Sequence, residues 1–152
     1  MGDDLLNGDT GDGKLYGDDG NDDLYGGNGQ DLLFGGAGND IVAGGTDEDI
    51  LNGNDGIHLL SGGGEDDIVN GDRSNGTFLF GRGDDSDVIT DFQNGLDLID
   101  ICDFARSTLY DAIAVGAAWV GFSIVLDFGA GDMVMVETGG AAATLTQDDF
   151  LL

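Results

Sequence analysis

The chain has 152 residues, of which 31 are acidic and four are basic, giving a formal net charge of −27 at pH 7. Such a chain repels polyanions, so nucleic acid is excluded as a partner and an anionic membrane surface is disfavoured unless a cation intervenes. No transmembrane span is expected either, because the longest apolar patch, residues 112–120, is short and is broken by Gly116.

A glycine recurs every nine residues from Gly17 to Gly71. The units that begin at these glycines are GDDGNDDLY, GGNGQDLLF, GGAGNDIVA, GGTDEDILN, GNDGIHLLS and GGGEDDIVN, and the eighth place of each is aliphatic. Earlier partial units extend this row toward the N-terminus, so that its members are Leu6, Leu15, Leu24, Leu33, Val42, Leu51, Leu60 and Val69. One nine-residue unit cannot bury its own apolar side chain and needs neighbours above and below it. The sequence therefore predicts a solenoid.

Each unit combines a short strand with a glycine-rich turn. A central side chain such as Leu33 is expected to point inward, and the glycines permit the positive φ that a sharp turn requires. Two units then complete one coil, and the sixth-place aspartates form two columns, Asp4, Asp22 and Asp40 on one edge and Asp31, Asp49 and Asp67 on the other. Stacked carboxylates repel one another, so a folded form needs a cation between them. Hard oxygen donors without a cluster of sulfur or imidazole favour calcium.

These units resemble the RTX calcium-binding nonapeptide GGxGxDxUx, in which U is aliphatic. The resemblance implies an all-β fold, with a right-handed parallel β-roll loaded with calcium over residues 1–76 and an antiparallel β cap over residues 77–152. Such modules end bacterial proteins that leave the cell by type I secretion. The resemblance therefore implies a secreted, extracellular, calcium-binding module.

In the RTX pattern, each ion lies between the sixth-place aspartates of two units eighteen residues apart and also binds backbone carbonyl oxygens. Carried onto this chain, the pattern implies four sites. Two lie on one edge: Asp4 and Asp22 with the carbonyls of Gly2, Gly17 and Asp19, then Asp22 and Asp40 with those of Asp18, Gly20, Gly35 and Ala37. Two lie on the opposite edge: Asp31 and Asp49 with the carbonyls of Gly27, Gly29, Gly44 and Thr46, then Asp49 and Asp67 with those of Gly45, Asp47, Gly62 and Gly64.

Several positions depart from this pattern. His58 stands where a sixth-place aspartate belongs, and calcium binds imidazole poorly. It marks either a pH-sensitive element or, in the interpretation we favour, a lost site with a solvated ring. Gly13 and Gly76 also lack the carboxylate at the ends of the array. Asp47 and Glu65 replace the fourth-place glycine, which keeps the carbonyl ligand; a positive φ would be strained at Glu65, and we expect those two sites to be weaker.

After residue 75, longer strand patterns replace the nonapeptides. Short strands are expected at residues 77–80, 88–89 and 98–101, with Phe78 continuing the inward row. The segment resembles the region that ends RTX arrays, and it retains Gly83, Asp87, Ile89, Asp91, Phe92, Gly95, Asp97, Ile99 and Asp100 of that ending. Either Asp85 or Asp87 is a candidate upper partner of Asp67.

The C-terminal part is rich in aromatic and β-branched residues. Residues 124–128 and 133–136 are expected to form a hairpin with a four-residue loop. The cap should cover the open end of the roll with a core of Phe92, Phe104, Trp119 and Phe122, and Cys102 should fill a gap in that core. The final segment LTQDDFLL suits either a secretion signal or a last strand.

No catalytic constellation is apparent, because the only histidine, His58, lies inside a turn and the carboxylate pairs belong to the columns. We therefore expect a non-enzymatic module, part of a larger secreted enzyme or adhesin, that folds on calcium outside the cell. Its implied partners are calcium, the type I secretion machinery and an N-terminal passenger domain whose export and stability it supports. The alternatives are a calcium-dependent module that binds a polysaccharide such as alginate, and an independent hydrolase.

Overall fold

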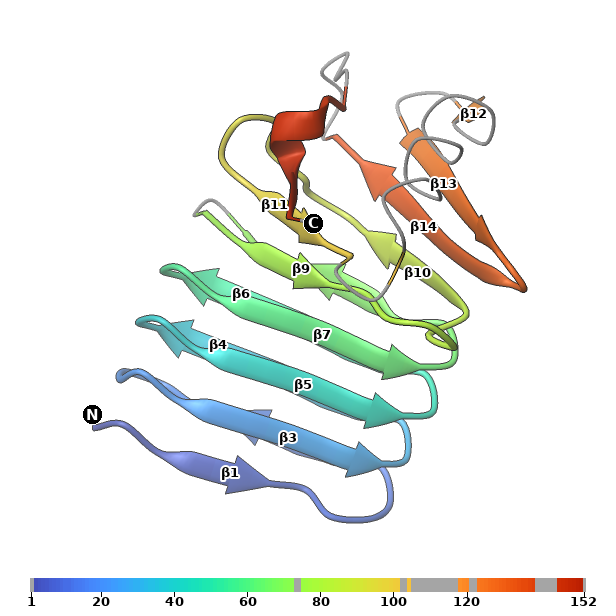
Figure 1. Cartoon of the computed structure of the whole chain (residues 1–152). Coiled ribbons are helices and arrows are strands. Elements are labelled where there is room, and N and C mark those ends of the chain that lie inside the picture. Colours follow the sequence, from blue (N-terminus) through green and yellow to red (C-terminus); the bar gives the residue numbers. More distant parts are fainter. Residues whose placement is uncertain are drawn as a thin grey trace.

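The computed structural model describes residues 2–72, 75–101, 104, 118–120, 123–138 and 145–151. The chain winds in successive coils that stack on one another, and the strands of these coils form two sheets (Figure 1). The first sheet contains, in spatial order, β1 (Leu5–Asn7), β3 (Asp23–Asn28), β5 (Ile41–Thr46), β7 (Leu59–Gly64), β9 (Thr77–Leu79), β11 (Leu98–Asp100) and β15 (Phe150–Leu151). The second contains β12 (Ala118–Val120), β13 (Ser123–Gly129), β14 (Asp132–Glu137), β10 (Ser86–Ile89), β8 (Ile68–Asn70), β6 (Ile50–Asp55), β4 (Leu32–Ala37) and β2 (Lys14–Tyr16). A short 3-10 helix, η2 (Gln147–Asp149), precedes β15.

The strands of the repeat region pair in parallel with an offset of one coil. Leu24 pairs with Val42 in the first sheet, and Leu33 pairs with Leu51 in the second. The hydrogen bonds between turns likewise join residues that are 18 apart in the sequence. Two nonapeptides therefore form each coil, and the predicted parallel β-roll is confirmed.

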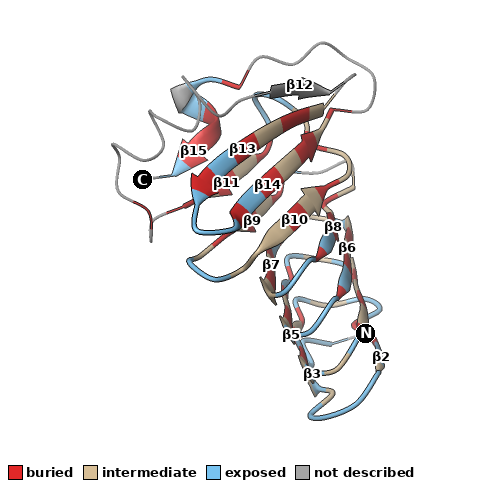
Figure 2. Cartoon of the chain, turned by 90° about the vertical axis from the view of Figure 1, so that its right-hand side faces the viewer, coloured by how far each residue is buried: buried red, intermediate tan, exposed pale blue. Residues whose placement is uncertain are grey.

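The aliphatic row lies in the narrow space between the two sheets. Its members from Leu15 to Val69 are buried, and Phe78, Ile89 and Ile99 continue the core into the later strands. Buried positions alternate with more exposed ones along the strands, as Figure 2 shows. Fixing the backbone of a whole nonapeptide costs more conformational free energy than burial of its one central side chain returns. The roll therefore needs a second source of stability.

The turns require positive φ at the second place of each unit. Gly36 has a φ of +110°, and a Cβ there would overlap the Asp18 carbonyl of the coil below. The strained φ anticipated at Glu65 is present, with a value of 77°, and Asp47 has a φ of 76° at the same place of its unit. The close stacking of coils thus depends on glycine, and Asp47 and Glu65 fold at a local cost.

Both sheets continue beyond residue 76 without interruption. β7, β9 and β11 pair in parallel, and β10 pairs in parallel with β8 on one side and β14 on the other. The strands expected at residues 77–80, 88–89 and 98–101 are present as β9, β10 and β11. Antiparallel pairing joins β12 to β13 and β13 to β14. The proposed cap is therefore built largely on the same two sheets, and its status as a separate domain stays a prediction.

The predicted hairpin is confirmed as β13 and β14, but its turn is shorter than expected. Gly129 and Asp132 still pair, which leaves only Ala130 and Gly131 between the strands. These two residues have φ values of 62° and 110°, as tight two-residue hairpin turns require. Pairing thus extends further into the GAGD segment than its composition suggests.

The structure describes the side chains of two of the four aromatic residues expected in the core of the cap. Phe92 and Phe104 are buried, and the Phe104 ring stacks on Phe128 with 4.6 Å between centroids while Arg82 lies over its ring. Phe122, Cys102 and the side chain of Trp119 lie outside the described residues. In the described part of the chain, no helix has the length and apolar character needed to cross a bilayer.

Candidate metal sites

The sixth-place aspartates stack directly above one another along each edge of the roll. On one edge, the Asp4 N–H donates to Asp22 Oδ1 at 2.7 Å, and the Asp22 N–H donates to Asp40 Oδ1 at 2.9 Å. On the other, the N–H groups of Asp31 and Asp49 donate to Oδ1 of Asp49 and Asp67 at 2.8 and 2.7 Å. The structure therefore brings together the aspartate pairs of all four sites implied by the sequence.

Five of the stacked aspartates have a second carboxylate oxygen that accepts no hydrogen bond. Among the described residues, the Oδ2 atoms without a hydrogen-bond donor are those of Asp22, Asp31, Asp40, Asp49 and Asp67. These side chains are at most 3% exposed. An unpaired carboxylate in such a place costs several kcal/mol, roughly, unless a cation compensates it. The columns thus offer oxygens that suit a bound cation.

Three of these unpaired Oδ2 atoms lie close to a backbone carbonyl oxygen of the coil above. Asp22 Oδ2 and the Gly35 carbonyl both lie beside the Gly17 Cα, within the space that a Cβ would fill. In the same way, Asp31 Oδ2 and the Gly44 carbonyl flank Gly26. Asp49 Oδ2 and the Gly62 carbonyl flank Gly44. Gly44 thus supplies the carbonyl beside Asp31 Oδ2 and, because it has no side chain, leaves space for Asp49 Oδ2. Carboxylate and carbonyl oxygens therefore converge where glycine removes a side chain.

The other implied carbonyl ligands lie in the stacked turns. Asp18 O accepts the Ala37 N–H, and Ala37 O accepts the Gly20 N–H. The carbonyl oxygens of Asp19 and Thr46 accept similar bonds from backbone N–H groups of the coil below. The carbonyl oxygens of Gly20, Gly27 and Gly45 each lie against a glycine of the coil above, in the space that a Cβ would fill. A carbonyl that accepts one hydrogen bond keeps a second lone pair for a metal. For Asp47, the structure shows its side-chain Oδ2 accepting the Gly29 N–H at 3.1 Å.

Two aspartates of the second column have a pKa above the ordinary aspartate value. Burial raises the pKa of Asp49 to about 6, with a further upward contribution from the charge of Asp31. Burial also raises the pKa of Asp67 to about 7, and Asp49 adds to that shift. In both cases a backbone hydrogen bond acts in the opposite direction. A cation bound between these groups would counteract the shift, because it favours the charged form of both carboxylates.

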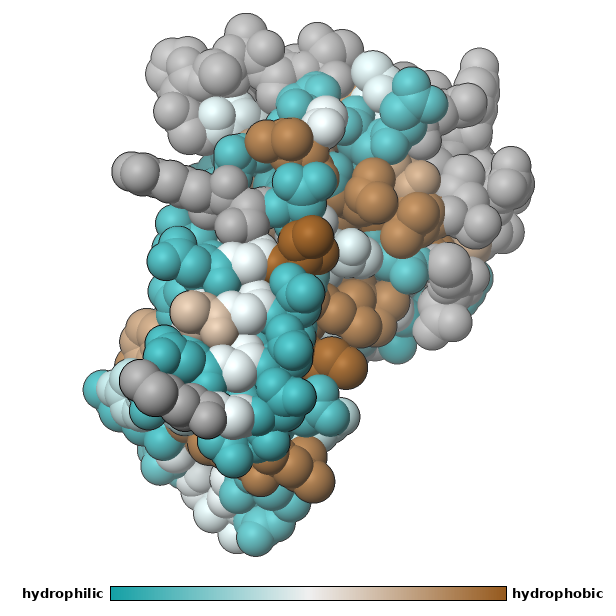
Figure 3. Space-filling view, turned by 90° about the vertical axis from the view of Figure 1, so that its left-hand side faces the viewer, coloured by the Kyte–Doolittle hydropathy of each residue, from teal (hydrophilic) through white to brown (hydrophobic). Residues whose placement is uncertain are grey.

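His58 occupies the slot of an aspartate in the first column. Its ring is 1% exposed, its Nδ1 accepts the Asp40 N–H at 3.3 Å, and Nδ1 also lies 3.3 Å from Asp40 Oδ2. Nε2 has no partner among the described residues. The expectation of a solvated ring is therefore wrong: the backbone of the turn is fixed by the coils on either side, so its side chain stays inside. Figure 3 faces this edge, where hydrophilic and pale residues run along the stacked turns.

Both columns continue into the cap with longer spacing. The Asp67 N–H donates to Asp87 Oδ1 at 3.0 Å across 20 residues, so of the two candidates above Asp67 the structure places Asp87 there. Burial raises the pKa of Asp87 to about 8. On the first edge, the Gly76 N–H donates to Asp97 Oδ1 at 2.8 Å across 21 residues. The sequence did not assign Asp97 to a column, because the constant spacing that identifies the others is lost.

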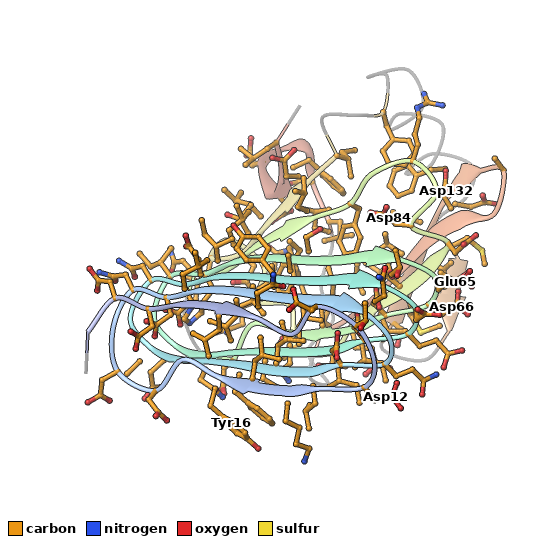
Figure 4. The ribbon with its side chains drawn as sticks, turned by 90° about the horizontal axis from the view of Figure 1, so that it is seen from below. Asp12, Tyr16, Glu65, Asp66, Asp84 and Asp132 are labelled. Carbon is orange, nitrogen blue, oxygen red and sulfur yellow. The ribbon has the colours of Figure 1, made fainter. Side chains whose placement is uncertain are left out.

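Additional carboxylates surround the top of the second column. Figure 4 shows Glu65, Asp66, Asp84 and Asp132 at one edge of the roll, seen from below. Asp66 Oδ1 accepts the Ser86 N–H, Asp84 Oδ2 accepts the Gly81 N–H, and Asp132 Oδ1 accepts the Gly83 N–H. These hydrogen bonds connect residues of the turns to one another. In the part of the chain that the structure describes, no three side chains of histidine, cysteine or acid type converge as a metal cluster.

Comparison with known proteins identifies the repeats. Residues 1–33 and 25–57 match the family of the RTX calcium-binding nonapeptide repeat. The repeats are RTX calcium-binding nonapeptides. A comparison of the chain with curated protein sequences finds no significant match.

Two solved structures are similar to this chain. The extracellular lipase LipA from Serratia marcescens shares 20% identity with a TM-score of 0.51, over 99% of this chain and 38% of the lipase. The chain thus spans about two fifths of the lipase, and the likeness supports the fold alone. A subunit of the Azotobacter vinelandii mannuronan C5-epimerase shares 27% identity over 99% of this chain and 78% of that subunit, with a TM-score of 0.34. That score is too low to support an argument about the fold.

Proposed function

We propose that this chain is a module that folds when calcium binds between its coils. The observation that carries the proposal is the set of buried Oδ2 atoms without a partner, stacked along both edges of an RTX roll. Calcium prefers carboxylate and carbonyl oxygens, the donor types that converge beside Gly17, Gly26 and Gly44. The ions would occupy the four aspartate pairs implied by the sequence and bind the carbonyls of the adjoining turns.

The expected energies suit a calcium-dependent fold. Extracellular calcium modules have dissociation constants of ~10⁻⁴ to 10⁻³ M, so millimolar calcium contributes roughly 0.4 to 1.4 kcal/mol per site. Four such sites contribute about 2 to 6 kcal/mol, which is comparable with the stability of a small domain. At submicromolar calcium that contribution disappears, and the net charge of −27 then opposes the compact state.

The biological role that follows is support of secretion. The chain would remain unfolded at the low calcium concentration of the cytosol, pass through a type I transporter and fold outside, which stabilises an attached N-terminal passenger domain. The RTX repeats support this role, and so does the fold likeness to part of an extracellular lipase. The module itself is non-catalytic; the activity would belong to the passenger.

Circular dichroism in EDTA and in millimolar calcium tests the proposal. We expect a largely disordered chain in EDTA and a β-rich spectrum in calcium, with no transition in magnesium because that ion dehydrates reluctantly. A chain that is fully folded in EDTA would overturn the proposal. Export is tested separately, by secretion of a fused reporter through a type I transporter with and without residues 1–152.

One observation favours a polysaccharide as an additional ligand. Tyr16 and Phe34 stack on the outer face of the roll, with ring centroids 5.0 Å apart and planes 5° apart, and Tyr16 is 51% exposed. Phe34 covers one face of the Tyr16 ring and holds the ring in place, so that the exposed part of Tyr16 could pack on the apolar face of a sugar ring while calcium links uronates to the acidic surface. Titration of alginate oligomers at fixed calcium tests this function. Binding that is absent, or that is unchanged in Tyr16→Ala, would contradict it.

A further inference from the structure

The outer faces of the two sheets differ at the seventh place of the units. In the second sheet, strand pairing joins the seventh-place residues and their register partners in the cap into one apolar row: Leu32, Ile50, Ile68, Val88, Met135 and Val125. The matching row of the first sheet is Leu5, Asp23, Ile41, Leu59, Thr77 and Leu98. Because the same backbone folds with Asp23 and Thr77 in this row, the roll does not require an unbroken apolar row there.

The six residues of the second sheet, which we call the outer row, face away from the core. Ile50 is 43% exposed and Ile68 is 44% exposed, whereas Leu51 and Val69, which follow them in the chain, are buried. The other members of the outer row are half-buried. Contiguous exposed apolar surface is more often an interaction site than isolated exposed apolar residues are.

Carboxylates line one side of the outer row. The fifth-place residues Asp12, Glu48 and Asp66 are exposed, and each precedes a seventh-place residue by two positions. Gln30 connects two of them, because its N–H donates to Asp12 Oδ1 at 3.1 Å and its Nε2 donates to Glu48 Oε2 at 2.9 Å. Figure 4 shows Asp12 and Asp66 at this edge of the roll and Tyr16 on its outer side. These carboxylates are not among the implied calcium ligands, so they keep their charge in the calcium-loaded roll.

We propose that the outer row and its acidic edge bind a positively charged amphipathic segment of a partner protein. Apolar side chains of the segment cover Ile50 and Ile68, and its lysine or arginine side chains face Glu48 and Asp66. A second copy of this chain fits less well, because it would bring the same carboxylates against one another and each copy carries a net charge of −27. The surface forms only in the calcium-folded roll, so the inference rests on the proposed function.

The length of the outer row sets the length of the segment. Neighbouring strands lie about 4.8 Å apart, so the part from Leu32 to Met135 spans roughly 19 Å. A helix rises about 1.5 Å per residue and covers that distance with about 13 residues. Its apolar stripe recurs every three to four residues, roughly one strand spacing apart. A helical peptide of about 18 residues is therefore a sufficient probe.

Binding of a labelled peptide of that length, with leucine on one face and lysine on the other, to the calcium-saturated protein tests the surface. Ile50→Thr/Ile68→Thr removes apolar area from the outer row and keeps β-branched residues that favour strands. Ile41→Thr/Leu59→Thr is the matched control, because these residues are 40% and 37% exposed at the same place of the first sheet. By fluorescence anisotropy, the first pair should weaken binding by about tenfold or more, and the control should stay within about twofold. A peptide with glutamate in place of lysine should not bind.

The outcomes separate this surface from the proposed function. Circular dichroism on the same samples shows whether each protein folds in calcium, and a chain whose β content does not respond to calcium overturns the proposed function. A folded Ile50→Thr/Ile68→Thr protein that binds the lysine peptide as tightly as the unaltered protein overturns the surface alone. Photo-cross-linking of the peptide to the unaltered protein does not depend on the variants: labels on β4, β6 and β8 support the surface, and labels on β3, β5 and β7 overturn it. A calcium-loaded dimer in sedimentation that becomes a monomer in Ile50→Thr/Ile68→Thr would assign the outer row to a second copy and overturn the partner.

Discussion

The two edges of the roll have the same backbone but different columns. On one edge, Asp31, Asp49 and Asp67 follow each other without a break and Asp87 continues the column. On the other, the column that starts at Asp4 is interrupted by His58. The backbone period therefore determines where sixth-place side chains stack, and the proposed calcium sites follow the positions at which two stacked side chains are aspartates. Changes at that place should have unequal effects on the two edges.

The largest effect is expected on the uninterrupted edge. Asp49 serves two implied sites, so Asp49→Asn should weaken both and cost about 1 to 3 kcal/mol at millimolar calcium. Asp72→Asn is the matched control, because it removes one carboxylate from a second place where only the backbone is expected to bind metal. Calcium titrations followed by circular dichroism should show a raised midpoint for the first variant only. Equal midpoints for the two variants would contradict the ladder.

A similar loss is expected when the space beside a carboxylate is filled. In Gly44→Ala, the new Cβ would meet Asp49 Oδ2 and the Gly62 carbonyl. Overpacking of this kind costs roughly 1 to 3 kcal/mol, and here it also blocks the oxygens from a cation. Gly64→Ala is the control, since its nearest neighbour would be the Gly83 oxygen at 3.7 Å. Thermal unfolding in calcium measures both, and equal melting temperatures would refute the cradle.

Replacing His58 by aspartate on the interrupted edge should change the stability in calcium by a smaller amount, and in the opposite direction. His58→Asp supplies a hard oxygen above Asp40, so we expect one more calcium ion per chain. At ten times its dissociation constant, that ion would stabilise the fold by ~1.4 kcal/mol. In EDTA the substitution adds like charge and should not stabilise. Isothermal titration calorimetry gives the stoichiometry, and an unchanged ion count would mean that the His58 turn does not bind calcium even with a carboxylate.

Protons should replace calcium only in part. The raised pKa values of Asp49 and Asp67, about 6 and about 7, mean that the calcium-free fold binds more protons than the unfolded chain, whose aspartates titrate near 3.8. Stability of the calcium-free fold should therefore rise as the pH falls from 8 to 5. Circular dichroism in EDTA should show more β structure at pH 5 than at pH 8. The opposite trend would mean that the columns are not buried without calcium.

The period of the sequence was sufficient to predict most of the roll. A constant nine-residue spacing sets the register, so Leu33, Asp22 and Asp49 could be assigned to a core row or to a column before any coordinates. The burial of His58 could not be predicted in this way, because the pattern describes the slot and not how an unusual side chain behaves in it. Its cause is the rigid turn, which neighbouring coils hold in place.

The end of the array was harder to predict. Asp87 and Asp97 join the columns across 20 and 21 residues, because longer loops replace the nonapeptide turns. A change of one or two residues per coil removes the period on which the assignment depended. The hairpin was recognisable from its alternation, but its turn was not, because pairing continues to Gly129 and Asp132.

A crystal structure of the calcium-loaded chain with anomalous scattering tests the central claim most directly. We expect ions between the aspartate pairs on both edges, each in contact with an Oδ2 atom such as that of Asp22 or Asp49 and with a carbonyl of the adjoining coil. Absence of anomalous peaks there, with the carboxylates paired to protein groups instead, would contradict it.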